Sequence, residues 1–212
     1  MAHPITSHLQ AAKHILRYLK GTATHGLSIH ASPSWSLQGY TDADWASCPN
    51  DRRSTNGFCL FFSTNLISWS STKQRVVSRS SAELEYRALA FLAAEVSWLQ
   101  FLLKELCIPQ PDTPLIWCDN INAAALAANS VFHGRSKHIE IDLHFVRDKV
   151  LRKELLIQYV PSTDQLADVF TKHVPSCQFS VARTRLSVVP IPVSLRGDDK
   201  QTPASAADSS PL

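Results

Sequence analysis

The sequence predicts an α/β fold, in which helices flank a mixed five-stranded sheet whose strands 1–3 are antiparallel and whose later strands are parallel. The first observation is a run of three short strand patterns with short connections, which is typical of an antiparallel meander. The second is a long amphipathic helix followed by alternating strand and helix patterns, which is typical of parallel strands. With 212 residues, 44% of them hydrophobic, the chain is long enough for one domain of ordinary size plus extensions.

The chain opens with a helix that is expected over 6–20. Leu9, Ile15 and Leu19 keep the spacing of one helix face, and Gly21 follows them as a C-terminal stop. This helix precedes the residues that form the main domain.

Three strands are expected after this helix. A loop rich in turn residues, among them Pro49 and Asn50, follows the first of them. The expected ranges are 37–45, 57–62 and 66–70. Because their connections are short, these strands form an antiparallel meander.

The longest helix is expected over 81–106, where Pro109 and Pro111 end it. A buried strand, an Ala-rich helix, a further helix, a strand and a final helix follow. Their expected ranges are 115–119, 122–128, 137–151, 155–160 and from about 163 onward. Beyond residue 187 the Pro, Ser, Ala and Asp content rises and periodicity disappears, so we expect a disordered tail.

Composition excludes several classes of protein. The sequence has no run of about 18 apolar residues and no secretory signal, so we expect neither a membrane span nor secretion. We expect the protein inside the cell, in the cytoplasm or the nucleus. The five cysteines fit neither a disulfide framework nor a zinc site, and we interpret them as reduced thiols. The net charge of +3 is compatible with a nucleic-acid partner but does not by itself argue for one.

Acidic residues stand in four separate fragments, at the ends of apolar strands or inside amphipathic helices. An isolated carboxylate in such a place is costly to bury unless it is paired, hydrogen-bonded or metal-bound. Asp42 and Asp44 lie two apart at the end of the first strand of the meander, so their side chains share a face. The alternative is that both are turn-forming aspartates at a strand exit.

The long helix carries two glutamates that helical geometry separates. Glu85 heads the core-facing row that continues through Ala88 and Leu92, so its side chain points inward. Glu83 lies three residues after Ser80, which is the spacing of a capping box. We therefore assign Glu83 to the cap and Glu85 to the site; the alternative for Glu85 is a partly exposed first-turn glutamate favoured by the helix dipole.

Asp119 and Asp168 complete the set. Asp119 ends an apolar strand, and ligands bind at the carboxyl ends of strands in open α/β sheets; the alternative is an N-cap aspartate. Asp168 lies within the expected final helix, whose Ser162 and Gln165 form a candidate capping box.

All four fragments suit positions around one end of the sheet, where their carboxylates would converge on two cations about 4 Å apart. Such ions would activate a water and stabilise the leaving oxygen of a phosphodiester. Hard oxygen ligands suit magnesium or manganese, and metal binding would relieve the repulsion among the carboxylates.

Five fragments in order resemble the ribonuclease H domain of copia-type LTR retrotransposon Pol polyproteins. They are Tyr-Thr-Asp-Ala-Asp-Trp-Ala, Ser-Ser-Ala-Glu-Leu-Glu-Tyr-Arg-Ala-Leu, Cys-Asp-Asn, Lys-His-Ile-Glu-Ile and Gln-Leu-Ala-Asp-Val-Phe-Thr-Lys, and they cover about 39–172. The opening residues resemble the segment that joins the reverse transcriptase to that domain, so we expect Met1 to lie inside a former polyprotein. The expected division is 1–30 as a reverse transcriptase remnant, 31–175 as the ribonuclease H-like domain and 176–212 as a divergent, disordered tail.

The resemblance implies metal-dependent cleavage of the RNA strand of RNA/DNA hybrids, with Mg²⁺ or Mn²⁺, two ions in number, as cofactors. Carried onto matching positions, the family's catalytic and metal-binding carboxylates are Asp42, Glu85, Asp119 and Asp168. It also implies a reverse transcriptase polymerase domain in trans as a partner, and no membrane. A histidine that the wider family often places before its last helix has no counterpart here; His138 is the nearest alternative, but histidines at helix entries are usually structural.

Hybrid recognition would depend on 2′-hydroxyls exposed in the wide minor groove and on phosphate contacts. Seven basic residues are candidates for phosphate contacts, although any of them could be only a solvated surface charge: Arg52, Arg53, Lys73, Arg75, Arg79, Arg135 and Lys137.

Three functions remain open at this point. The first is an active ribonuclease H, and the second is a catalytically silent remnant that binds nucleic acid. The third is another two-metal nuclease, such as an integrase-like strand-transfer enzyme, which should need a DNA-end-binding region that the sequence does not show. Metal-dependent cleavage separates the first from the second, and preference for a hybrid over duplex DNA separates the first from the third.

Overall fold

The structure is a computed structural model that describes residues 3, 5–45, 52–74, 77–78, 80–120 and 140–191. The chain divides into two compact units, one formed by Met1–Gly26 with Val189–Leu212 and the other by Leu27–Val188. In the first unit, helix α1 (Thr6–Thr22) buries none of its residues, and it continues through Gly21, so the expected stop at Gly21 is wrong. The second unit contains the sheet and all the acidic residues of interest. No helix in the described ranges has an apolar stretch long enough to cross a bilayer.

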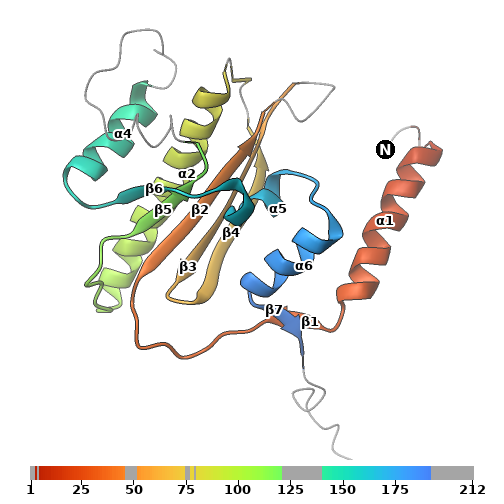
Figure 1. Cartoon of the computed structure of the whole chain (residues 1–212), viewed down its shortest axis with the longest axis horizontal. Helices are drawn as coiled ribbons and strands as arrows, with labels where there is room; N and C mark the ends of the chain where they lie inside the picture. The colour runs from red at the N-terminus through yellow and green to blue at the C-terminus, as the bar shows by residue number, and fades with distance from the viewer. Residues whose placement is uncertain are drawn as a thin grey trace, which may run out of the picture. The chain divides into compact units, whose positions relative to one another are not determined.

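The second unit is built on a mixed five-stranded sheet with the strand order β4-β3-β2-β5-β6 (Figure 1). Strand β2 runs antiparallel to β3, and β3 runs antiparallel to β4, whereas β5 runs parallel to both β2 and β6. The strands are β2 (Leu37–Asp44), β3 (Thr55–Phe62), β4 (Asn65–Lys73), β5 (Leu115–Cys118) and β6 (Leu156–Tyr159). This arrangement confirms the predicted α/β fold with its antiparallel strands 1–3 and later parallel strands.

One face of the sheet is covered by α2 (Ser81–Glu105), with α4 (Glu140–Leu151) packed beside it (Figure 1). The fully buried residues of α2 include Leu89 and Leu92, which join the main hydrophobic cluster. A Cβ added at Gly39 of β2 would lie 2.9 Å from Leu92 Cδ2, so glycine is what allows the helix to approach the strand this closely. The apolar row of α2 therefore fixes how the helix lies on the sheet.

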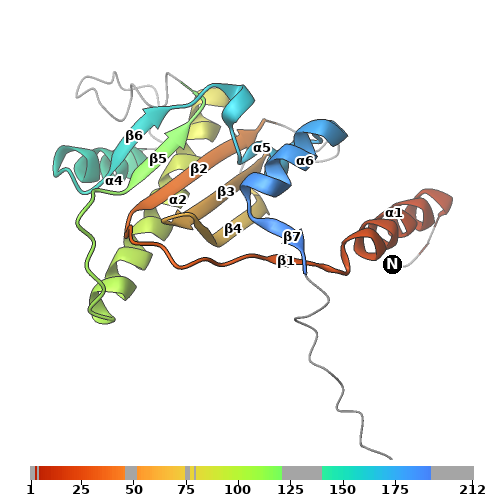
Figure 2. The same cartoon turned by 60° about the horizontal axis from the view of Figure 1, so that its bottom comes forward.

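The opposite face carries two further helices, α5 (Asp168–Thr171) and α6 (Ser176–Arg185), as Figure 2 shows. Alternate residues of β3 serve the two faces: Leu60 packs in the α2 cluster, whereas Phe61 packs with Leu166 and Leu186 in a second cluster. The sheet is therefore packed on both faces, and Asp42 lies near the end of its central strand β2.

The expected final helix from residue 163 is wrong. The chain forms a short 3₁₀ turn, η2 (Ser162–Asp164), then an extended residue at Gln165, and α5 begins only at Asp168. The expected capping box of Ser162 and Gln165 is also wrong, because the Gln165 amide bonds to the Thr41 carbonyl oxygen instead. A tertiary hydrogen bond has replaced a local one.

Two short strands were not expected. β1 (His25–Leu27) pairs with β7 (Val188–Pro190). The expectation of disorder from about residue 187 is wrong for β7, and α6 likewise lies in the segment assigned to the tail. Strands of three residues are too short to show alternation. The Ala-rich helix expected over 122–128 and the tail over 192–212 lie outside the described residues, as does the expected start of α4 at 137.

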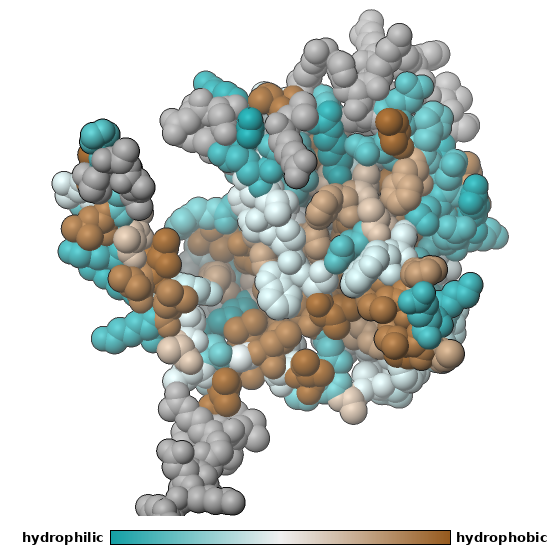
Figure 3. Space-filling view, turned by 180° about the vertical axis from the view of Figure 1, so that it is seen from behind, coloured by the Kyte–Doolittle hydropathy of each residue, from teal (hydrophilic) through white to brown (hydrophobic). Residues whose placement is uncertain are grey.

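Hydrophobic side chains also remain on the surface (Figure 3). Large examples in the second unit are Trp69 of β4 and Trp98 of α2, which are 54% and 58% exposed. Apolar atoms make up more than half of an ordinary protein surface, so these residues are not unusual one by one.

Candidate metal centre

Asp42 lies near the end of β2, where it pairs in register with Gly57 of β3. Its side chain is almost fully buried, at 1% exposure. The Thr171 hydroxyl donates a hydrogen bond to Asp42 Oδ2, and the Lys172 ammonium lies 3.2 Å from Asp42 Oδ1. Asp44 follows on the same face, and burial, together with the nearby Asp42 carboxylate, raises its pKa.

Glu85 extends from the first turns of α2. Ser80 caps this helix by accepting a hydrogen bond from the Glu83 amide at 3.1 Å, and the Glu83 carboxylate forms an ion pair with Arg87 at 2.7 Å. Glu83 thus lies at the capped start of the helix, and Glu85 is the glutamate at the site, as the periodicity predicts. Glu85 Oε2 is enclosed and has no hydrogen-bond partner among the described residues. Burial, and then repulsion from Asp42 and Asp119, raises the pKa of Glu85 to about 9.

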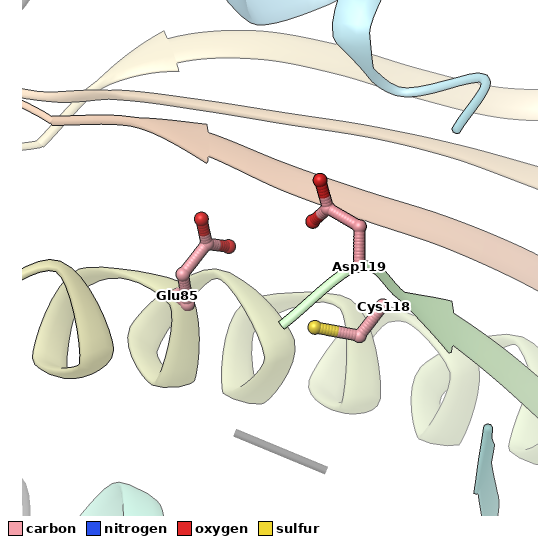
Figure 4. A group of neighbouring side chains, drawn as sticks. All are labelled: Glu85, Cys118 and Asp119. Carbon is pink, nitrogen blue, oxygen red and sulfur yellow. The ribbon is translucent and has the colours of Figure 1, made fainter. Parts of the chain in front are cut away.

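Asp119 follows the last residue of β5. The Ser162 hydroxyl donates to Asp119 Oδ2 at 3.3 Å, whereas Oδ1 is enclosed and unpartnered within the described ranges. In Figure 4 the carboxylates of Glu85 and Asp119 lie close together, with the Cys118 thiol beside them. One ligand atom from each of these three residues lies within 4.8 Å of the other two.

Cys118 is interpreted from the sequence only as a reduced thiol and is not placed at the metal centre, although it immediately precedes Asp119. Burial raises the pKa of the Cys118 thiol to about 12, so this group remains neutral at ordinary pH. A neutral thiol is a poor ligand for a hard cation. The carboxylate oxygens are therefore the effective donors on this side of the centre.

Asp168 stands in the first turn of α5. One oxygen from each of Asp42, Asp119 and Asp168 lies within 4.8 Å of the other two. Burial raises the pKa of Asp168; a hydrogen bond from Lys172 opposes this effect, and the Asp42 charge adds to it. Asp119 belongs both to this group and to the group that it forms with Glu85 and Cys118. All four predicted carboxylates therefore meet at one end of the sheet.

The residues fit a divalent cation. Four carboxylates supply the hard oxygen donors that Mg²⁺ and Mn²⁺ prefer. Two of their oxygens, Glu85 Oε2 and Asp119 Oδ1, are enclosed without a hydrogen bond from any described residue, which is costly unless a cation or another donor satisfies them. Burial of Glu85, and then its crowding against Asp42 and Asp119, raises its pKa, which is the result expected for carboxylates gathered where a cation would otherwise balance them.

Lys172 is a residue of the centre that sequence reasoning missed. Its ammonium lies 3.0 Å from Asp168 Oδ1 and 3.2 Å from Asp42 Oδ1. Although burial lowers the pKa of Lys172, the carboxylates of Asp42 and Asp168 outweigh that effect and raise it. The spacing of four residues between Asp168 and Lys172 was the available signal.

The basic candidates fall into two groups. Arg52, Arg53 and Lys73 are exposed, and the strand register places them at the same end of the sheet as Asp44, which pairs with Thr55. Lys73 also lines a groove of about 850 Å³ between the sheet edge, α2 and α4. The remaining candidates, together with His138, lie outside the described residues: Arg75, Arg79, Arg135 and Lys137.

Comparison with known proteins gives close relatives in sequence, although no family model matches. The chain is 45% identical over 194 residues to the retrovirus-related Pol polyprotein from transposon RE1 of Arabidopsis thaliana, an alignment that covers 92% of this chain and 13% of the polyprotein. It is 36% identical over 183 residues to the Pol polyprotein from transposon TNT 1-94 of Nicotiana tabacum, which covers 86% of this chain and 14% of that protein. The chain thus spans only a small part of these relatives.

A solved structure supports the fold described above. LC11-RNase H1, isolated from compost, aligns with a TM-score of 0.50 and 15% identity, over 65% of this chain and 93% of that chain. Identity this low supports the fold alone. Together with the sequence relatives, it shows that this chain belongs to the retrovirus-related Pol polyproteins of copia-type transposons, within which it forms a domain of the ribonuclease H fold.

Proposed function

We propose that this chain is a two-metal-ion ribonuclease H, which hydrolyses the RNA strand of RNA/DNA hybrids by endonucleolytic cleavage with Mg²⁺ or Mn²⁺. The observation that carries the proposal is the meeting of Asp42, Glu85, Asp119 and Asp168, from four separate segments, at one end of the sheet. Membership of a Pol polyprotein family and the ribonuclease H fold support the same function.

In this proposal the four carboxylates are the metal ligands. Bound cations would supply an activated water and stabilise the leaving oxygen of the phosphodiester. The chain's own contribution is to hold the ligands in place. Ser162 orients Asp119 through its hydroxyl, and Thr171 does the same for Asp42, so neither carboxylate has to be ordered when the substrate binds.

Hybrid binding would use the positive charge beside this centre. Arg52, Arg53 and Lys73 lie at the end of the sheet that carries Asp42 and Asp44, where they can reach phosphates on either side of a scissile bond. Discrimination of RNA from DNA would come from the 2′-hydroxyls of the wide minor groove. Because the relatives are Pol polyproteins, we also propose that a reverse transcriptase polymerase domain in trans increases hybrid affinity, and that the protein acts inside the cell, in the cytoplasm or nucleus.

The test uses the purified chain and three end-labelled duplexes of one sequence: an RNA/DNA hybrid, duplex DNA and duplex RNA. We expect cleavage of the RNA strand of the hybrid only, in Mg²⁺ or Mn²⁺ and not in EDTA. Asp119→Asn, which keeps the size of the side chain, should abolish it. If a folded protein binds the hybrid without cleaving it, the chain is instead a catalytically silent nucleic-acid-binding remnant.

A further inference from the structure

Lys172 occupies the space between two of the candidate metal ligands. It is the residue directly after α5, and its backbone amide still bonds to the Asp168 carbonyl oxygen at 2.9 Å. This keeps the side chain on the same side of the helix as Asp168. Its ammonium bridges Asp168 Oδ1 and Asp42 Oδ1 at 3.0 and 3.2 Å.

Both carboxylate oxygens of Asp42 already have a partner in this arrangement. Thr171 donates to its Oδ2, Lys172 lies on its Oδ1, and the side chain is only 1% exposed. On the other side of the centre, Glu85 Oε2 and Asp119 Oδ1 have no partner within the described residues. The two halves therefore differ among the described residues, because a lysine partly balances the negative charge of one half and Glu85 Oε2 and Asp119 Oδ1 have no such partner.

We propose that Lys172 is an internal competitor for one of the two cations: its ammonium bridges Asp42 and Asp168 in the metal-free protein and has to leave before a divalent ion binds between them. This inference rests on the metal centre of the proposed function and adds a mechanism that regulates it. The Lys172 side chain is 37% exposed, so it has a route into solvent, whereas Asp42 does not.

The bridge has two opposing effects. It stabilises the metal-free protein, because one positive charge lies between two carboxylates that otherwise repel each other. It also weakens the binding of a divalent cation, because the cation must displace the Lys172 ammonium before it can bind to Asp42 and Asp168. The side of the centre formed by Glu85 and Asp119 would therefore take up an ion first, and the Asp42 and Asp168 side would do so only at higher metal concentration.

The test compares Lys172→Met with Lys149→Met. Lys149 of α4 pairs with Glu154, which follows the helix, at 3.2 Å, so its replacement removes the same charge without touching the centre. Mn²⁺ binding to each protein is measured by titration with electron paramagnetic resonance, and the stability of the metal-free protein by denaturant unfolding in EDTA. We expect Lys172→Met to bind one Mn²⁺ about tenfold or more tightly than the unmodified chain and to be less stable in EDTA. Lys149→Met should leave Mn²⁺ affinity unchanged.

Each outcome decides the inference separately from the proposed function. Equal Mn²⁺ affinity in the unmodified chain and in Lys172→Met overturns the inference and leaves the metal centre standing. Equal gains in both variants also overturn it, because net charge then explains the effect. If only Lys172→Met binds Mn²⁺, the inference holds and the metal-dependent function of the unmodified chain fails. If no protein binds Mn²⁺, both fail.

A second variant covers loss of folding. If Lys172→Met does not fold without metal, Lys172→Gln takes its place, because the amide can still donate hydrogen bonds to Asp42 and Asp168. The expected direction is the same, with tighter Mn²⁺ binding than in the unmodified chain, and unchanged affinity overturns the inference.

Discussion

Gln165 donates a hydrogen bond from its side-chain amide to the carbonyl oxygen of Thr41 at 2.9 Å, across 124 positions of sequence. Its side-chain oxygen accepts a second bond from the Ala167 amide at 3.1 Å. Gln165 is buried, and its two bonds join the strand that carries Asp42 to the segment that leads into Asp168. This residue therefore sets the distance between two of the candidate metal ligands.

Replacing Gln165 should weaken both the fold and the centre. Gln165→Ala removes the buried hydrogen bonds to the Thr41 carbonyl and from the Ala167 amide, and we expect a loss of about 1–3 kcal/mol in the free energy of unfolding. Mn²⁺ affinity should fall as well, because Asp168 is no longer held beside Asp42. Denaturant unfolding and Mn²⁺ titration measure the two effects. Gln158→Ala on the exposed side of β6 is the control, and an equal effect of both variants would contradict this role.

Gly57 allows α5 to approach the sheet. A Cβ at this position would lie 2.6 Å from Thr171 Cγ2 and 2.8 Å from Phe170 Cβ, so α5 must shift if a side chain is added here. We expect Gly57→Ala to lose about 1–3 kcal/mol of stability and to bind Mn²⁺ more weakly than the unmodified chain. In Gly21→Ala the new methyl group meets nothing within 4 Å, and helix propensity predicts unchanged or slightly increased stability. Retained metal affinity in Gly57→Ala would show that α5 does not position the ligands.

The stability of the metal-free protein should fall as the pH rises. The pKa of Glu85 is raised from its ordinary value of 4.5 to about 9, so the folded protein holds a proton that the unfolded chain releases over this range. The contribution to stability is thus greatest below pH 4.5, declines by at most about 1.4 kcal/mol per pH unit, and levels off above pH 9. The raised pKa values of Asp44 and Asp168 act in the same direction.

Glu85→Gln isolates this effect. The amide cannot ionise, so the variant should lose the Glu85 part of the pH slope and should be more stable than the unmodified chain at pH 8 in EDTA. Denaturant unfolding between pH 5 and pH 9 gives the slope of each protein. An identical slope in both proteins would mean that Glu85 ionises normally. It would contradict the raised pKa that we attribute to burial and to the neighbouring carboxylates.

Lys73 should contribute to hybrid binding through phosphate contact. We expect Lys73→Ala to bind an RNA/DNA hybrid more weakly and to reduce the slope of log affinity against log salt by about 1. Lys104, near the far end of α2, is also exposed, lies about 29 Å along the helix from Glu85 and serves as the control. Equal slopes for Lys73→Ala and the unmodified chain would remove Lys73 from the proposed interface.

Regular periodicity explains which parts of this structure could be predicted. The inward position of Glu85 follows from the 3.6-residue period of a 25-residue helix, and Asp42 follows from alternation along β2. Gln165 and Lys172 could not be found in the same way, because their roles depend on partners that are distant in sequence or on a four-residue helix. The Gln165 bond also explains why the expected helix from 163 fails, since tertiary contact overrides a local capping pattern.

The four-carboxylate centre is tested most directly by single-turnover hydrolysis of a labelled hybrid in Mg²⁺ by the unmodified chain and by its four isosteric variants. The variants are Asp42→Asn, Glu85→Gln, Asp119→Asn and Asp168→Asn. We expect cleavage of the RNA strand by the unmodified chain in Mg²⁺, and a loss of at least about a hundredfold in each folded variant, because each removes one ligand of a shared centre. Cleavage that persists in any of these variants at the unmodified rate would contradict a centre made of these four carboxylates.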